Sequence, residues 1–182
     1  MRLRRLREEL GPALVIESRA FPLRPTPDPS VRFKGTYREE GWRRCAQMAA
    51  ADGITFTPWP HEVFASWSLP ALEAAKCVAN QGESLAERVH LGLYEAFFTH
   101  SRNIADREEV ARIVAETGAD MARFTADYAS GLGREAVVGD YEAALADGVR
   151  AIPTVVIAET GRAVTGLADL ATYRAAVSEA AG

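Results

Sequence analysis

The stretch Gly148–Thr165, GVRAIPTVVIAETGRAVT, has the sequence pattern of a β-hairpin. The β-branched run 152–158 favours a strand, and Pro153 is compatible with the start of a strand, where its missing N–H is tolerated. Turn-forming residues at 159–161 separate this run from a second short strand predicted over 162–165. We therefore predict two antiparallel strands joined by a tight turn.

Helices are predicted on both sides of this hairpin. The segment 134–147 has a helical pattern, and Gly148 supplies the residue that commonly ends a helix. The segment 167–181 is rich in alanine, the residue with the highest helix propensity. The C-terminal part of the chain is therefore predicted as helix, hairpin and terminal helix.

The N-terminal part of the chain has an α/β pattern. Leucines recur at helical spacing in 1–10, and Gly11-Pro12 ends that helix. The apolar, then alternating segment 13–21 predicts a strand. The sequence FPLRPTPDPS at 21–30 contains four prolines, which predicts an extended loop.

The middle of the chain is predicted to be almost entirely helical. One helix is expected over 36–52, with Gly53 after it. Asp106 and Glu109 have the spacing of a capping box, and Asp120 is a second candidate N-cap. The further helices are predicted over 69–79, 84–99, 106–117 and 120–129.

Composition limits the class of protein. With 182 residues, of which 48% are hydrophobic, the chain can bury one sizeable core and is expected to form one domain with an insertion. The formal net charge of -4 argues against nucleic acid as a partner. The sequence contains no apolar run of membrane-spanning length and no secretory signal pattern, so no membrane partner is expected.

Three stretches of sequence carry a resemblance to a known family: SRAFPL at 18–23, LGLYEAFFTHSRNIAD at 91–106 and GVRAIPT at 148–154. Together they resemble the cytoplasmic DsbA-like group of the thioredoxin superfamily, often called FrnE-like, which is close to the glutathione-dependent 2-hydroxychromene-2-carboxylate isomerases. The first stretch is similar to the strand and turn after the first family helix, the second resembles the insertion helix and the loop after it, and the third resembles the cis-proline loop. The resemblance covers nearly the whole chain.

The resemblance implies an α/β, thioredoxin-like fold with an all-helical insertion domain. The strands at 13–21, 154–158 and 162–165 would form its sheet, and the first strand of the family would be missing from the chain. The expected parts are the N-terminal part of the thioredoxin-like domain at 1–57, the helical insertion at 58–133, and the C-terminal part with the cis-proline loop at 134–182.

The resemblance also implies a binding site. In the family, the backbone of the residue before the cis-proline pairs with an extended substrate or with glutathione, which assigns substrate binding to Ile152 and Pro153. From the residues alone, an ordinary trans proline at the start of a strand stays open. Glutathione would act as a co-substrate, and no bound cofactor is expected.

The redox chemistry of the family uses a CxxC motif at a helix N-terminus, which lowers the pKa of the first thiol. The two cysteines of this chain, Cys45 and Cys77, are too far apart for that motif. Cys45 lies on a helical stripe with Trp42 and Ala49, and Cys77 lies among alanines and a valine, so both are predicted to be packing residues. We therefore assign no catalytic residue.

The helix that follows the motif in the family matches 2–10, so the motif would lie upstream of Met1. The chain is therefore expected to be inactive as a disulfide oxidoreductase or shortened at its N-terminus. Two alternatives stay open: an isomerase of the 2-hydroxychromene-2-carboxylate type, and a non-catalytic module that binds a peptide or thiol and closes its sheet differently or as a homodimer. The expected location is the cytoplasm.

Other candidate residues are weaker. His61, His90 and His100 lack the spacing of metal ligands, so no metal site is expected. His90 is predicted to be a core or interface residue. Three aromatic residues at helical spacing are predicted to be core, with a ligand-facing role as the alternative: Tyr94, Phe97 and Phe98.

Overall fold

The computed structural model describes residues 1–181 and divides into two compact units. The hairpin unit consists of Met1–Phe21 and 142–181, and the helical unit consists of Pro22–Tyr141. The domain boundaries predicted at 57/58 and 133/134 stay predictions.

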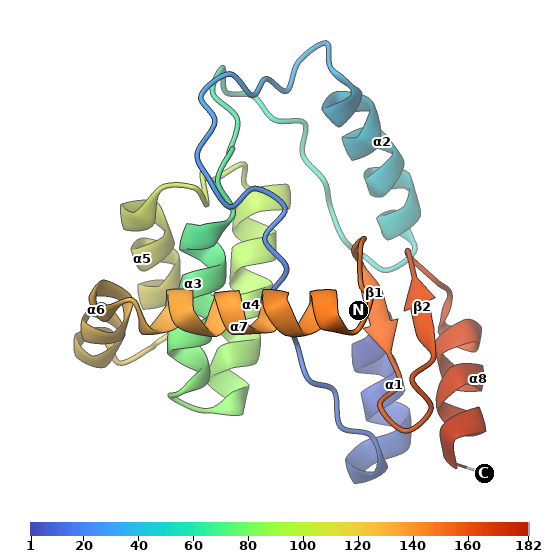
Figure 1. The fold of residues 1–182 in the computed structure, drawn as a ribbon. Helices are drawn as coiled ribbons and strands as arrows, with labels where there is room; N and C mark the ends of the chain where they lie inside the picture. The colour runs from blue at the N-terminus through green and yellow to red at the C-terminus, as the bar shows by residue number, and fades with distance from the viewer. Residues whose placement is uncertain (182) are drawn as a thin grey trace. The chain divides into compact units, whose positions relative to one another are not determined.

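A two-stranded antiparallel sheet forms the centre of the hairpin unit (Figure 1). Strand β1 (Thr154–Val156) pairs with β2 (Ala163–Thr165), and Val155 is opposite Val164. The turn falls where the sequence pattern placed it, so the predicted hairpin is confirmed.

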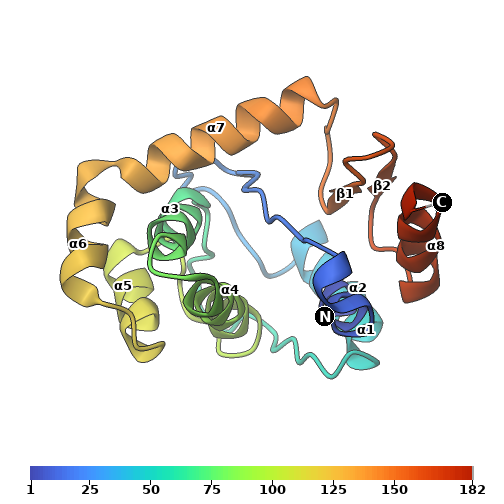
Figure 2. The same cartoon turned by 90° about the horizontal axis from the view of Figure 1, so that it is seen from below.

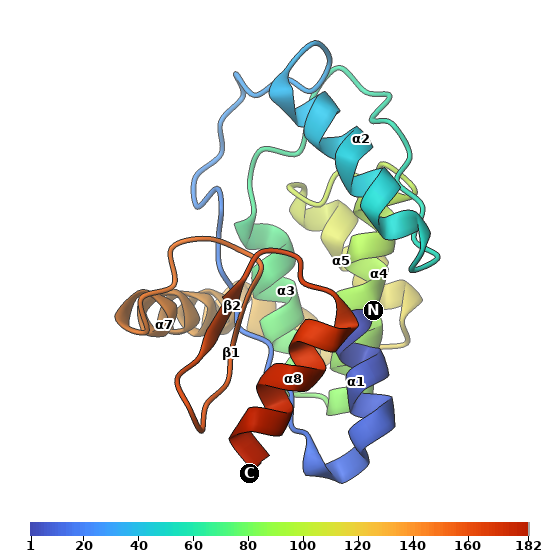
Figure 3. The ribbon, with the colours of Figure 1, turned by 90° about the vertical axis from the view of Figure 1, so that its right-hand side faces the viewer.

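The two ends of the chain pack together in the same unit. Helix α1 (Arg2–Leu10) and helix α8 (Leu170–Ala181) lie side by side (Figure 3). Leu6 of the apolar stripe of α1 is 1% exposed and lies in the core, whereas Leu10 at the end of the stripe is 37% exposed. The Arg174 guanidinium pairs with the Glu9 carboxylate at 2.7 Å. Both predicted helices are therefore confirmed.

The strand predicted over 13–21 is wrong. A short 3-10 helix (Gly11–Ala13) leads into extended backbone at Leu14, but 14–21 does not belong to the sheet, whose order is β1-β2. Extended backbone becomes a strand where a neighbouring strand supplies a regular ladder, and that neighbour is not encoded in the local residue pattern.

Six helices begin in the helical unit, and the last of them ends in the hairpin unit. Thr36, Asp106 and Asp120 cap three of them by accepting hydrogen bonds from main-chain N–H groups of the first turn. The caps at Asp106 and Asp120 were predicted from the sequence. The helices are α2 (Tyr37–Ala50), α3 (Leu69–Ala79), α4 (Glu83–Phe98), α5 (Arg107–Glu116), α6 (Met121–Ser130) and α7 (Leu132–Ala146).

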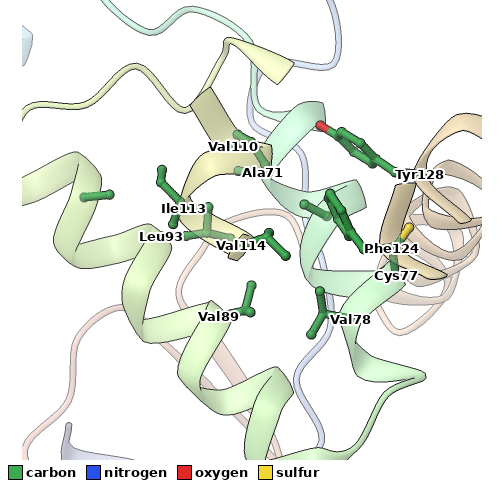
Figure 4. Close-up of a cluster of buried hydrophobic side chains, with 12 residues drawn as sticks. Ala71, Cys77, Val78, Val89, Leu93, Val110, Ile113, Val114, Phe124 and Tyr128 are labelled. Atoms are coloured by element: carbon green, nitrogen blue, oxygen red, sulfur yellow. The ribbon is translucent and has the colours of Figure 1, made fainter. Parts of the chain in front are cut away.

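Helices α3, α4, α5 and α6 bury the larger of two apolar clusters in the helical unit (Figures 2 and 4). Its fully buried members include Val78, Val89, Val110 and Val114. Phe124 and Tyr128 stack at 5.0 Å in the same cluster. Among residues 1–181, no helix is both long enough and apolar enough to cross a membrane.

A second cluster of the helical unit is aromatic. Trp42 of α2 lies 5.3 Å from Phe97 and 5.0 Å from Phe98 between ring centroids, and its indole N–H donates to the Thr57 carbonyl oxygen at 2.9 Å. Phe97 and Phe98 therefore pack against the core as predicted. Tyr94, in contrast, is 53% exposed, so the prediction of a core role is wrong for that residue.

Helix α3 also buries a carboxylate. The Glu73 side chain is 3% exposed and accepts hydrogen bonds from Arg107 at 2.7 Å and Arg134 at 2.8 Å. Two guanidinium partners compensate the cost of burying this charge. Glu73 thereby links α3 to α5 and α7.

Candidate functional site

The candidate site is the loop that connects α7 to β1 in the hairpin unit. Helix α7 ends at Ala146, and Gly148 reverses the chain with a φ of 77°, a value that favours glycine. The Val149 N–H donates to the Ala144 carbonyl oxygen at 2.8 Å, and the Gly148 N–H donates to Leu145 at 3.1 Å. The helix end therefore fixes the first half of the loop.

Arg150 adds a side-chain connection to the same helix end. Its guanidinium donates from Nη1 to the Leu145 carbonyl oxygen at 2.8 Å and to the Val149 carbonyl oxygen at 3.0 Å. A cation is favourable here because the C-terminal carbonyl groups give a helix a partial negative charge. Sequence reasoning missed this residue; an arginine shortly after a helix-ending glycine was the available signal.

Ile152 and Pro153 lie together on the exposed second half of the loop, and the peptide bond between them is cis. The Pro153 carbonyl oxygen accepts from the Gly166 N–H at 2.7 Å, and the Ala151 carbonyl oxygen accepts from the Thr154 hydroxyl at 2.7 Å. Ile152 lies between these two anchors. Within residues 1–181, its own N–H and C=O make no hydrogen bond.

A shallow concavity of about 170 Å³ adjoins this loop. Charged and hydroxyl groups line it together with small residues. The lining residues are Asp147, Gly148, Val149, Arg150, Ala151, Thr154, Ala163 and Thr165. The concavity lies entirely within the hairpin unit.

The two thiols have different environments. Cys77 is fully buried in the apolar cluster of the helical unit, as predicted (Figure 4). Burial raises the pKa of the Cys77 thiol, which disfavours the reactive thiolate. The predicted burial of Cys45 is wrong, because that residue is exposed on α2.

The helical geometry of α2 explains the exposure of Cys45. Trp42 is buried, and Ala46 and Ala49, four and seven residues further on, are partly buried on the same face. Cys45 follows Trp42 by three residues and falls on the solvent side of this stripe.

The histidines do not form a metal site. His90 is exposed and contacts the Tyr94 ring at 4.8 Å between centroids, so its predicted core role is wrong. A His61 ring nitrogen lies 3.1 Å from the Ser101 carbonyl oxygen, and His100 lies 3.5 Å from Glu95. In the part of the chain that the structure describes, no three histidine, cysteine or carboxylate residues are grouped to hold a metal ion.

Comparisons with known proteins agree with this architecture. A family model, the DSBA-like thioredoxin domain, matches residues 1–178. The chain is similar to the crystal structure of "a putative protein disulfide isomerase from Nitrosomonas europaea", with 14% sequence identity and a TM-score of 0.79, over 98% of this chain and 87% of that chain. At this identity the likeness shows the fold alone. The search of curated proteins found no match.

The predicted thioredoxin-like α/β fold with a helical insertion is therefore confirmed. The expected closeness to the 2-hydroxychromene-2-carboxylate isomerases stays a prediction. Because the family model spans almost the entire sequence, the chain belongs to the family of DSBA-like thioredoxin domains.

Proposed function

We propose that this chain recognises the substrates of DSBA-like thiol–disulfide chemistry, and that it binds an extended peptide or glutathione through the main chain of Ile152. One observation carries the proposal. Ile152 is 42% exposed, its N–H and C=O have no hydrogen-bond partner within residues 1–181, and the residues on both sides of it are anchored. A peptide group of the ligand supplies the acceptor and donor that these two groups lack.

The expected affinity is low. Each main-chain hydrogen bond contributes about 0.5–1.5 kcal/mol after the loss of hydration, so a pair of bonds contributes about 1–3 kcal/mol. Contact with the exposed Ile152 side chain adds apolar burial. A dissociation constant of about 1 mM corresponds to about 4 kcal/mol, which is the range that these contacts support. Such weak binding suits a substrate that must leave after reaction.

The thiol exchange itself is not assigned to the cysteines at positions 45 and 77. Burial and a raised pKa make Cys77 a poor nucleophile. Cys45 is exposed on α2 but is not part of a CxxC pair. Membership of the family supports an oxidoreductase-type role, and substrate recognition is the step that the described residues support.

The proposal is tested by titration with two probes while the amide resonances are followed. The first probe is a terminally blocked alanine pentapeptide with a central S-methylcysteine, and the second is glutathione. We expect saturable shifts at Ile152 and Thr154 and none at Val114, which is buried in the helical unit. The matched control is the same pentapeptide with its central residue N-methylated, which removes the hydrogen-bond donor.

Two results would overturn the proposal. One is the absence of shifts at 150–154 with either probe up to about 10 mM, well above the expected dissociation constant. The other is equal binding of the N-methylated and unmodified pentapeptides, because the donated hydrogen bond would then contribute nothing.

A further inference from the structure

The loop before Ile152 is held by few hydrogen bonds. Within the described residues, the main-chain N–H groups of Arg150, Ala151 and Ile152 have no hydrogen-bond partner. The loop does not belong to the ladder that begins at Thr154. The loop between Val149 and Pro153 is therefore held in place by hydrogen bonds from two side chains, the guanidinium of Arg150 and the hydroxyl of Thr154.

We propose that Arg150 is a positioning residue for substrate binding, which fastens the loop to the end of α7 and so presents the main chain of Ile152. This inference rests on the proposed function. The two bonds from Nη1 connect Arg150 to carbonyl groups of Leu145 and Val149, that is, to the helix end and to the turn after it. Ile152 follows only two residues later.

The chemistry of the arginine fits a positioning role. Arg150 is exposed and makes no ion pair within residues 1–181, so a carboxylate does not compete for the guanidinium. Asp147 lines the same concavity and leaves its electrostatic character mixed. The contacts that the guanidinium does make are with main-chain carbonyl groups at a helix C-terminus, where a cation is stabilised.

Fixing this loop before binding increases affinity. A mobile loop loses conformational entropy when a ligand orders it, whereas an ordered loop has already lost it on folding. Replacing Arg150 with methionine removes the hydrogen bonds but keeps an unbranched side chain. We expect the pentapeptide and glutathione to bind about three- to tenfold more weakly to Arg150→Met, which corresponds to the loss of one or two net hydrogen bonds.

Arg150→Lys is the informative conservative variant. A lysine keeps the positive charge but lacks the planar guanidinium with its fixed donor geometry. We therefore expect Arg150→Lys to restore part of the affinity that Arg150→Met loses. The matched control is Arg162→Met, which removes an exposed arginine of the same unit whose partner is Glu179 on α8. We expect Arg162→Met to bind both probes like the wild type.

Further readouts separate positioning from direct contact. If Arg150 positions the loop, the loss on Arg150→Met is the same for neutral and glutamate-containing pentapeptides and is insensitive to salt. The thermal midpoint stays close to that of the wild type, while line broadening at 150–152 reports a more mobile loop. A loss confined to the glutamate-containing peptide would overturn positioning in favour of charge contact.

The failure of this inference is distinct from the failure of the proposed function. If the wild type binds neither probe, the proposed function fails. If the wild type binds the probes, and both Arg150→Met and Arg150→Lys bind them as tightly as the wild type does, the positioning role alone is overturned. Should Arg150→Met not fold, the lysine variant decides: weaker binding than the wild type supports positioning, and unchanged binding contradicts it.

Discussion

Gly133 lies against the main chain of Glu73 so closely that a Cβ atom on Gly133 would overlap the Glu73 carbonyl oxygen. The same Cβ would be 2.8 Å from the Cys77 sulfur. Two helices, α3 and α7, therefore approach each other at a position that only glycine permits.

The close approach predicts that Gly133→Ala destabilises the protein. The methyl group meets main-chain atoms that cannot rotate away, and such overpacking costs about 1–3 kcal/mol. Gly139→Ala on the same helix is the matched control, since nothing lies within 4 Å of its Cβ position. There we expect a gain of up to about 1 kcal/mol from helix propensity. Urea unfolding measures both, and equal stability changes in the two variants would contradict the packing found at Gly133.

At Ser101, in contrast, a substitution is expected to stabilise the protein. It follows α4 with a φ of 52°, it is 4% exposed, and its buried hydroxyl has no hydrogen-bond partner within residues 1–181. Ser101→Gly removes both the strained backbone and the unsatisfied hydroxyl, so we expect a gain of about 1 kcal/mol. Ser101→Ala removes the hydroxyl alone and should gain less. A loss of thermal stability in Ser101→Gly would show that the hydroxyl has a partner in solution.

A cluster of charges on the helical unit predicts a dependence of stability on pH. Arg102 donates to Glu109 at 2.5 Å and to Glu116 at 2.7 Å, and these hydrogen bonds hold the pKa values of both carboxyl groups below their usual range. A lowered pKa in the folded state contributes stability at neutral pH that is lost as the pH falls below the unfolded-state value of about 4.3.

Arg102→Gln should therefore reduce the free energy of unfolding by about 1 kcal/mol at pH 7, since solvent screens these partly exposed groups, and have a smaller effect near pH 3. Urea unfolding at a series of pH values measures the difference. Arg123→Gln is the control, because its contact with Asp127 is 3.9 Å long and exposed. An Arg102→Gln deficit that is constant from pH 7 to pH 3 would contradict the electrostatic origin.

The thiol environments predict that this chain does not catalyse the reduction of insulin by dithiothreitol. Cys45→Ser should leave both the rate of insulin reduction and the stability of the protein unchanged, since Cys45 is exposed. Cys77→Ser should destabilise the protein by about 1–3 kcal/mol, because a hydroxyl replaces a sulfur inside an apolar cluster. Catalysis that disappears in Cys45→Ser would show that Cys45 is a reactive thiol.

Elements defined by local chemistry were predictable from the sequence. The N-cap residues Asp106 and Asp120 located two helix starts, and the turn at 159–161 located the hairpin. Each depends on residues that are neighbours in the sequence.

The failures depend on distant partners or on exact helical angles. The segment 14–21 has a strand-like residue pattern but lies outside the sheet, because a strand also needs a neighbouring strand elsewhere in the chain. Cys45 is adjacent in sequence to Ala46, which is partly buried on the core-facing side of α2. Residue spacing alone does not tell which of the two neighbours faces the core. The position of Arg150 shortly after Gly148 was an available signal for a contact with the helix end, but the choice of the Leu145 carbonyl oxygen as its partner depends on the folded loop.

The central claim, that the main chain of Ile152 binds the substrate, is tested most directly by amide hydrogen exchange at that residue. In the free protein we expect the Ile152 N–H to exchange at close to the rate of an unstructured amide, whereas the Val149 N–H, bonded to Ala144, is protected. Saturation with the alanine pentapeptide should slow exchange at Ile152 by about tenfold and leave Arg150 and Ala151 unchanged. An Ile152 amide that is already protected in the free protein, or that stays unprotected when the peptide is bound, would contradict the account.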